Sequence, residues 1–301
     1  MPSFESYRQR IGYATGAFFL GTATGGSAGA SSTLVDGDDI VATSRAVNEM
    51  LEDYWLLRPD AAAAGDRVRS VATYTPSTGT FAVDRNYTNT PVSTDQYELH
   101  GLIEPWTLML DLVNQALKRI LLPFEFTLTI SSTTAKRQSL AGQTWLTDRR
   151  WVRQVGLLES GETRADTDPY ETRAVHGEVV RDGATLYLFH PRRSFSTTTT
   201  LYVKAMRSAY TLCRASGAGA YGDQSGLSAE AHQAIPVEEW VAAAAVNDFW
   251  LREAKARTGN ARDEALKNAA EMAAWFTRET NLHYEEEPLT FFPLRTWGPR
   301  R

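Results

Sequence analysis

The hydrophobic pattern is most regular in residues 31–121, where strands and then a helix are predicted. Residues 67–74 and 80–85 are rich in β-branched and aromatic side chains, which is typical of strands. Between them, Pro76 suits the first central position of a type I turn, and Gly79 suits the left-handed position that follows. The pattern therefore predicts a β-hairpin.

A further strand over residues 93–100 and a strongly apolar helix follow the hairpin. Pro105 stands in the first helical turn, where its missing N–H needs no partner. Apolar residues then recur at helical spacing as far as Leu121. Such a helix must be covered by protein, from this chain or from a neighbour. We assign five of its residues to packing between subunits: Trp106, Met109, Leu110, Val113 and Leu117.

The N-terminal residues predict a short helix capped by Ser3, with Phe4, Tyr7 and Ile11 on one face. The tract 21–33 consists almost entirely of Gly, Ser, Thr and Ala. This composition favours an arm or connector over a core segment.

Three acidic residues, Asp36, Asp38 and Asp39, come next, beside a glycine. They lack the alternating ligands and the distal glutamate of an EF-hand calcium loop. We therefore expect a solvated turn that caps the following helix. Residues 44–57 are predicted to begin as a helix and to become a strand near Trp55.

Residues 124 to 210 predict a series of short strands after a break at Pro123. An Asp-Gly turn at Asp182 joins two of them tightly. Many short strands with regular turn signals favour an antiparallel sandwich or barrel. The candidate strands are residues 124–131, 143–147, 151–159, 173–182, 184–190 and 197–210.

The C-terminal part predicts two helices, from Pro236 to about Ala256 and over residues 261–281, separated by a turn at Gly259. This is an αα-hairpin. The tail 285–301 is spaced by prolines, so it predicts neither a helix nor a central strand. We expect it to dock on a partner through its apolar and basic residues: Phe291, Phe292, Leu294, Arg295, Trp297, Arg300 and Arg301.

These elements together predict an α+β protein with four segments. Residues 1–122 form an N-terminal module of arm, β-hairpin and helix, and residues 123–215 form an inserted antiparallel β domain. Residues 216–284 form the helical hairpin, and residues 285–301 form the extended docking tail.

Composition narrows the function. The 301 residues are 43% hydrophobic and 22% charged, which is typical of a globular chain with a sizeable core. A formal net charge of −5 argues against a protein whose main role is to grip a nucleic-acid backbone. The single cysteine, Cys213, excludes a disulfide framework. No run has the length of a membrane span, and we expect no signal peptide.

The sequence carries no recognisable catalytic motif. The five histidines lack the spacing of metal ligands, and there is no G-x-S-x-G elbow. The Gly-rich stretch 216–226 is not a phosphate-binding loop, since it has no G-K-[ST]. Acidic residues are plentiful, but nothing selects a glycosidase-like pair among them. We expect no enzyme activity, metal or cofactor.

Several segments resemble one family, the head-to-tail adaptors (connectors) of tailed bacteriophages. The resemblance covers residues 1–121 best. Its motifs are G-T-A-T…S-S-T-L-V-D, the aromatic strand near Tyr54 and Trp55, G-D-R-V-R-S-V-A-T-Y…T-G-T-F-A-V-D-R, D-Q-Y-E-L-H and P-W-T…N-Q-A-L-K-R-I. The chain is longer than a minimal adaptor, which is mostly a helical bundle.

The resemblance implies a structural virion protein at the head–tail junction, assembled from subunits made in the host cytoplasm. Adaptors form a ring, usually dodecameric, that joins the portal ring to the tail or the next neck protein. Double-stranded DNA would pass through the channel without specific binding, as an acidic or neutral lumen allows.

A second hypothesis is a glycan- or receptor-binding protein of the tail or a fibre, using aromatic residues of the β domain. Trp145, Trp151, Tyr187 and Tyr202 would provide the stacking surfaces. A polysaccharide-degrading hydrolase is a third hypothesis, without any motif in its favour.

Overall fold

The computed structural model describes residues 2–16, 18–37, 51–129, 137–140, 142–143, 146, 152–158, 178–182, 185–189, 200–215, 222 and 225–285. The chain forms two compact units: residues 1–118 with 213–281, and residues 119–212 with 282–301. The described elements are helices and antiparallel strands, so the predicted α+β class is confirmed. Residues 119–212 of the second unit are inserted into the sequence of the first.

The first unit begins with helix α1 (Phe4–Ala14). Ser3 caps it as predicted, because its hydroxyl accepts a hydrogen bond from the backbone N–H of Ser6 at 3.2 Å. Phe4, Tyr7 and Ile11 are all fully buried. The predicted apolar face of this helix is therefore confirmed.

A seven-stranded antiparallel sheet follows, in the order β1-β7-β4-β5-β6-β3-β2. Eight of the residues inside the sheet form one apolar core, which includes Leu56, Phe81, Tyr97 and Leu99. The two edge strands, β1 and β2, follow one another in the sequence with only two residues between them. The sheet must therefore curve strongly to bring its two edges close together. The strands are β1 (Phe18–Thr22), β2 (Gly25–Ser27), β3 (Thr33–Val35), β4 (Trp55–Leu57), β5 (Val68–Thr75), β6 (Thr80–Val83) and β7 (Gln96–His100).

Strands β5 and β6 form the predicted hairpin, with Thr75 opposite Thr80. Gly79 has φ +62°, which confirms the left-handed position that the turn requires. Its carbonyl accepts a hydrogen bond from the N–H of Asp36 at 2.9 Å. The hairpin turn is thereby joined to the segment that follows β3.

The glycine-rich tract 21–33 belongs to the sheet, so its prediction as an arm was wrong. Gly21 pairs with Tyr97, and Gly26 pairs with Leu34. A Cβ on Gly21 would lie only 2.5 Å from the Tyr97 hydroxyl oxygen. Glycine here permits close packing against an aromatic ring rather than flexibility.

The prediction of a solvated turn at Asp36 was also wrong. Asp36 is fully buried, and it accepts a hydrogen bond from the Tyr97 hydroxyl at 2.5 Å. Asp38, Asp39 and the helical start of residues 44–57 lie outside the described residues. The predicted strand near Trp55 is confirmed as β4, whereas the short 3₁₀ helix η1 (Ala64–Asp66) precedes β5.

Helix α3 (Thr107–Arg119) is the predicted apolar helix. Its start is fixed by Glu104, whose carboxylate accepts hydrogen bonds from the N–H groups of Trp106 at 3.0 Å and Leu108 at 2.6 Å. A carboxylate at a helix N-terminus accepts hydrogen bonds from N–H groups that have no partner within the helix. Its negative charge also interacts favourably with the positive end of the helix dipole.

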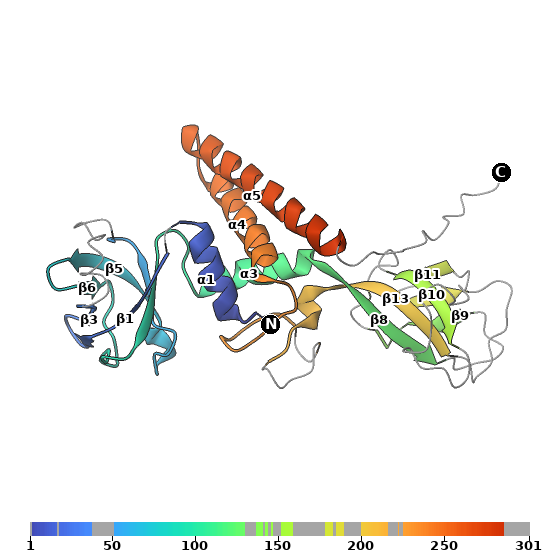
Figure 1. The fold of residues 1–301 in the computed structure, drawn as a ribbon, viewed down its shortest axis with the longest axis horizontal. Coiled ribbons are helices and arrows are strands. Elements are labelled where there is room, and N and C mark those ends of the chain that lie inside the picture. Colours follow the sequence, from blue (N-terminus) through green and yellow to red (C-terminus); the bar gives the residue numbers. More distant parts are fainter. Residues whose placement is uncertain are drawn as a thin grey trace. The chain divides into compact units, whose positions relative to one another are not determined.

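Helices α4 (Glu238–Ala256) and α5 (Asn260–Glu285) form the predicted hairpin (Figure 1). Asn247 donates a hydrogen bond to the Ala269 carbonyl at 2.7 Å, and Trp240 donates one to Thr280 at 2.9 Å. Gly259 turns the chain with φ +60°. A run of buried residues from Trp240 to Asn247 makes α4 the central helix of its bundle.

The described residues of the second unit form two three-stranded antiparallel sheets, β10-β13-β8 and β11-β12-β9. Residues of both sheets, such as Val203 and Leu188, share one apolar core, which is a sandwich arrangement. The sheets are open, so the alternative of a closed barrel was wrong. The unit comprises β8 (Leu121–Thr129), β9 (Arg137–Ser139), β10 (Val152–Leu158), β11 (Glu178–Asp182), β12 (Thr185–Phe189), β13 (Thr200–Ser208) and the 3₁₀ helix η3 (Ala209–Leu212).

Pro123 does not break the chain as predicted, because it lies inside β8 opposite Met206. β8 is an edge strand of its sheet. Proline is tolerated there, since the hydrogen bond that it cannot donate would point away from the neighbouring strand. The tight turn after Asp182 is consistent with its pairing opposite Thr185.

Candidate functional site

A buried cluster of charged side chains is the most unusual feature of the first unit. Arg8 of α1 is fully buried, and its Nε and Nη2 atoms donate to the two carboxylate oxygens of Glu98 at 2.7 and 2.8 Å. Its Nη1 atom donates to Glu230, in the segment before α4. One guanidinium thus holds two carboxylates, the first by the bidentate geometry that suits arginine best.

Two further side chains complete the hydrogen bonding of Glu98. The Nε2 atom of His100 lies 2.9 Å from Glu98 Oε2, and the Gln9 side chain donates to Oε1 at 3.2 Å. Burial alone would raise the pKa of Glu98, but the hydrogen bonds and charges of Arg8 and His100 outweigh it and lower that pKa to about 2. Burial lowers the pKa of His100, although its bond to Glu98 opposes that shift.

Glu230 has the opposite electrostatic balance. Burial raises its pKa, and the nearby charges of Glu98 and Glu5 add to that effect, whereas Arg8 opposes it. The positive charge of Arg8 is already matched by Glu98, so it compensates a second carboxylate only in part. The charged form of Glu230 is therefore less stabilised by the cluster than that of Glu98.

The cluster is sealed from solvent. The side chains of Arg8, Glu98 and His100 are at most 1% exposed, whereas Gln9 is half-buried and Glu230 is 26% exposed. A substrate has no access to groups buried to this degree. The arrangement instead fixes α1 against β7 and against the segment before α4, and Tyr7 adds a hydrogen bond to the Pro236 carbonyl at 2.5 Å.

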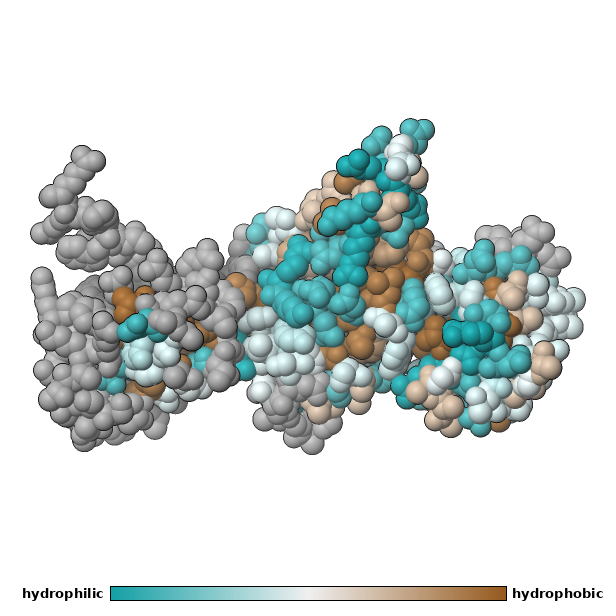
Figure 2. Space-filling model, turned by 180° about the vertical axis from the view of Figure 1, so that it is seen from behind, coloured by the Kyte–Doolittle hydropathy of each residue, from teal (hydrophilic) through white to brown (hydrophobic). Residues whose placement is uncertain are grey.

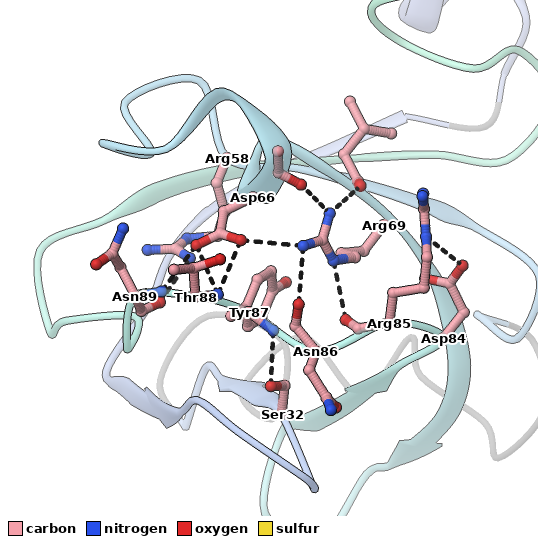
Figure 3. Close-up of polar contacts among 12 residues, drawn as sticks. Ser32, Arg58, Asp66, Arg69, Asp84, Arg85, Asn86, Tyr87, Thr88 and Asn89 are labelled. Carbon is pink, nitrogen blue, oxygen red and sulfur yellow. Dashed lines mark hydrogen bonds and ion pairs between the residues drawn. The ribbon is translucent and has the colours of Figure 1, made fainter.

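A second polar cluster holds the loop between β6 and β7 (Figure 3). Buried Asp66 accepts hydrogen bonds from the backbone N–H groups of Thr88 and Asn89 and from the guanidinium of Arg69 at 3.0 Å. These bonds lower the pKa of Asp66 although burial opposes them. Arg69 also donates to backbone carbonyls on either side, including that of Asn86 at 2.9 Å.

Tyr87 lies at the centre of the same loop. The guanidinium carbons of Arg58 and Arg69 lie 4.8 and 5.2 Å from the centroid of its ring. Its N–H donates to Ser32 at 2.8 Å, and Arg58 pairs with Asp95 at 2.5 Å. Because these groups are buried and paired, this cluster has a structural role, as the first one does. It holds the loop between β6 and β7 in place.

The residues predicted for subunit packing lie mostly in the core of the chain itself. Met109, Val113 and Leu117 are at most 1% exposed within the first unit. Trp106 and Leu110 are half-buried, and the ring of Trp106 packs edge-to-face with that of Phe4, with centroids 5.6 Å apart. The apolar stripe of α3 is therefore covered by this chain, which corrects the assignment of those three residues to a contact between subunits.

The predicted docking residues of the tail, Phe291 to Arg301, lie outside the described residues. So do Trp145 and Trp151 of the glycan-binding hypothesis. Tyr187 is half-buried on β12, and Tyr202 lies on β13 opposite Thr127. Both assignments stay predictions.

Within the described ranges, no group of three His, Cys, Asp or Glu side chains has a metal-binding arrangement. Cys213 is buried, which raises its pKa to about 11 and keeps it a thiol. None of the helices that the structure describes combines the length and the apolarity needed to cross a membrane.

The free end of the α4–α5 hairpin has a polar surface. Figure 2 shows it as mostly hydrophilic, in teal, above apolar surface near the middle of the view. Exposed residues there include Arg257, Arg262, Asp263 and Lys267. This end of the hairpin is suited to water or to polar contacts.

The sequence contained one overlooked signal of the buried cluster. Arg8 stands four residues after Phe4 and three before Ile11, so it occupies the apolar face of α1. A charged residue on a buried apolar face is almost always paired with an opposite charge. Its partners, 90 and 222 residues away, could not be identified from the sequence.

Comparison with known proteins adds no family. No family model matches the chain, and no curated protein matches it.

Proposed function

We propose that this protein is a structural component of a tailed bacteriophage, a head-to-tail adaptor that forms a ring between the portal and the tail. The observation that carries the proposal is the arrangement of the segments that resemble this family. Those segments contribute to β1, β3 to β7 and α3, and they share one compact unit with the α4–α5 hairpin. The β sandwich is an insertion into that unit, which accounts for the length of the chain beyond a minimal adaptor.

The buried charges support a structural role. Arg8 and Asp66 each use their hydrogen-bonding capacity to fix segments of their own chain. A subunit with net charge −5, repeated around a ring, also leaves a DNA channel without strong attraction for phosphates. In this proposal the tail 285–301 joins the ring to the portal by burying a few aromatic anchors.

The test is to mix the purified full-length chain with its cognate portal ring and to examine the product by native mass spectrometry and negative-stain imaging. We expect one copy of this chain per portal subunit. A chain that stays monomeric and ignores the portal would overturn the adaptor proposal.

Two variants locate the contact. A chain truncated after Glu287, and a full-length variant with Phe291→Ala, Phe292→Ala and Trp297→Ala, are both expected to lose portal binding. Val92→Ala is the matched control, since Val92 is 53% exposed in the first unit. Binding by the truncated chain would exclude the tail as the anchor while leaving the adaptor role intact.

A further inference from the structure

The outer edge of β1 is unpaired among the residues that the structure describes. β1 pairs with β7 on one side, and no backbone hydrogen bond joins its other side to any residue that the structure describes. Leu20, at the middle of the strand, is 46% exposed. An exposed edge with apolar side chains is a template for pairing with another strand.

Apolar surface continues from this edge onto α1. Tyr13 is 60% exposed, and its ring packs on that of Phe18 with centroids 4.6 Å apart. Phe18 and Leu20 are two residues apart on β1, so they share one face of the sheet. The edge and the Tyr13 ring therefore form one continuous apolar strip.

Two other edge strands of this chain, β2 and β8, carry safeguards against such pairing. At the opposite edge of the sheet, β2 has only three residues, and Pro91 lies close to Gly26. In the second unit, the edge strand β8 contains Pro123. Short length and proline both discourage pairing with another chain, and β1 has neither safeguard.

Charge indicates which partner fits. No charged residue occurs between Arg10 and Asp36, so β1 and both of its flanks are neutral. When two copies of one strand pair across a two-fold axis, each charge near the axis meets its own copy, and like charges opposite one another are destabilising. The neutral sequence Phe18–Thr22 avoids this repulsion.

We propose that β1 pairs with β1 of a second copy of this chain, antiparallel and centred on Leu20, which joins two sheets into one. Leu20 then faces Leu20 of the partner subunit, and the two apolar strips meet at the axis. A pair of five-residue strands is small beside a standard protein interface, so this dimer is weak and forms at high protein concentration. The proposal concerns the isolated chain and does not depend on the adaptor role.

The first test is sedimentation equilibrium of the full-length chain without portal, across a wide range of concentrations. We expect a monomer–dimer equilibrium. Leu20→Lys should raise the dissociation constant at least about tenfold, because it places two lysines face to face. Leu266→Lys is the control, since it adds the same charge at an exposed apolar site on α5, outside the sheet.

The second test fixes the register by cysteine cross-linking. Leu20→Cys should form a disulfide-linked dimer under mild oxidation. Thr22→Cys should not, since the two copies of that residue would lie about 13 Å apart, beyond disulfide reach. The wild type is the uncross-linked control, because Cys213 is buried.

Three results would overturn the proposal: a monomer at every concentration, association that Leu20→Lys leaves unchanged, or equal cross-linking of both cysteine variants. Circular dichroism and the melting temperature establish that each variant is folded. If Leu20→Lys fails to fold, the cross-linking comparison decides alone.

Discussion

Arg8 and Glu98 form a bidentate ion pair in which neither side chain is more than 1% exposed. The pair joins the first helix of the chain to the second strand of the sheet order, across 90 residues of sequence. A buried pair of this kind is costly to break, since the partner left behind is a buried charge without compensation.

Replacing Arg8 by lysine should destabilise the first unit by about 3 kcal/mol, because an ammonium cannot make both bonds to Glu98 and the bond to Glu230 in the same geometry. Urea denaturation followed by tryptophan fluorescence measures the loss. Arg10→Lys is the matched control, since the Arg10 side chain is 39% exposed and its pair with Glu239 is 3.5 Å long. Equal effects of the two substitutions would contradict the role assigned to Arg8.

The lowered pKa of Glu98 predicts acid sensitivity. Its folded-state pKa, about 2, lies below the usual value of 4.5, so its contribution to stability is present above pH 4.5 and is lost as the pH falls toward 2. The shift corresponds to a loss on the order of 3 kcal/mol across that window. Glu98→Gln should flatten this part of the stability profile, measured by denaturation at a series of pH values, whereas exposed Glu239→Gln should leave it unchanged.

For Glu230 we expect the opposite dependence of stability on pH. Its pKa is raised, so the folded state favours the protonated form. That contribution is complete below the unfolded pKa and is lost as the pH rises through the folded pKa. The stability of Glu230→Gln relative to the wild type should therefore increase as the pH rises above the usual glutamate pKa of 4.5. A variant whose relative stability falls as the pH rises would show that the Arg8–Glu230 attraction outweighs the cost of burial.

The loop between β6 and β7 depends on one carboxylate. Asp66→Asn removes an acceptor for Arg69, Thr88 or Asn89 and should destabilise the first unit by about 2 kcal/mol. Hydrogen exchange should speed up at the amides of Thr88 and Asn89. Asp60→Asn is the control, because Asp60 is an exposed aspartate of the same unit. Unchanged exchange at Thr88 would contradict the proposed tether.

The sequence pattern correctly predicted the helices and the hairpin whose formation depends on residues close together in the chain. The hairpin of β5 and β6, the apolar face of α1 and the helices α3 to α5 follow from periods of two and of 3.6 residues and from Pro and Gly at defined positions. The bounds differ by a few residues where a side chain sets the end, as Glu104 does for α3.

Contacts between distant segments could not be predicted in this way. Gly21 lies in a tract with the composition of a linker. The reason for a glycine at this position is the Tyr97 ring, which leaves no room for a Cβ. The apolar stripe of α3 predicted burial correctly, but a sequence cannot tell a cover made by its own chain from one made by a neighbour. Arg8 and Glu98 meet only because the sheet places β7 beneath α1.

Gly79 provides the sharpest test of the hairpin. Its φ of +62° disfavours any residue with a Cβ, and a Cβ there would collide with the carbonyl of Asp36. Gly79→Ala should therefore cost about 3 kcal/mol, from backbone strain plus the displacement of the segment after β3. Gly65→Ala is the control, since nothing lies within 4 Å of a Cβ at that position. Thermal denaturation should show a large drop for the first variant and little change for the second. Equal melting temperatures for the two variants would mean that the turn relaxes without disturbing Asp36.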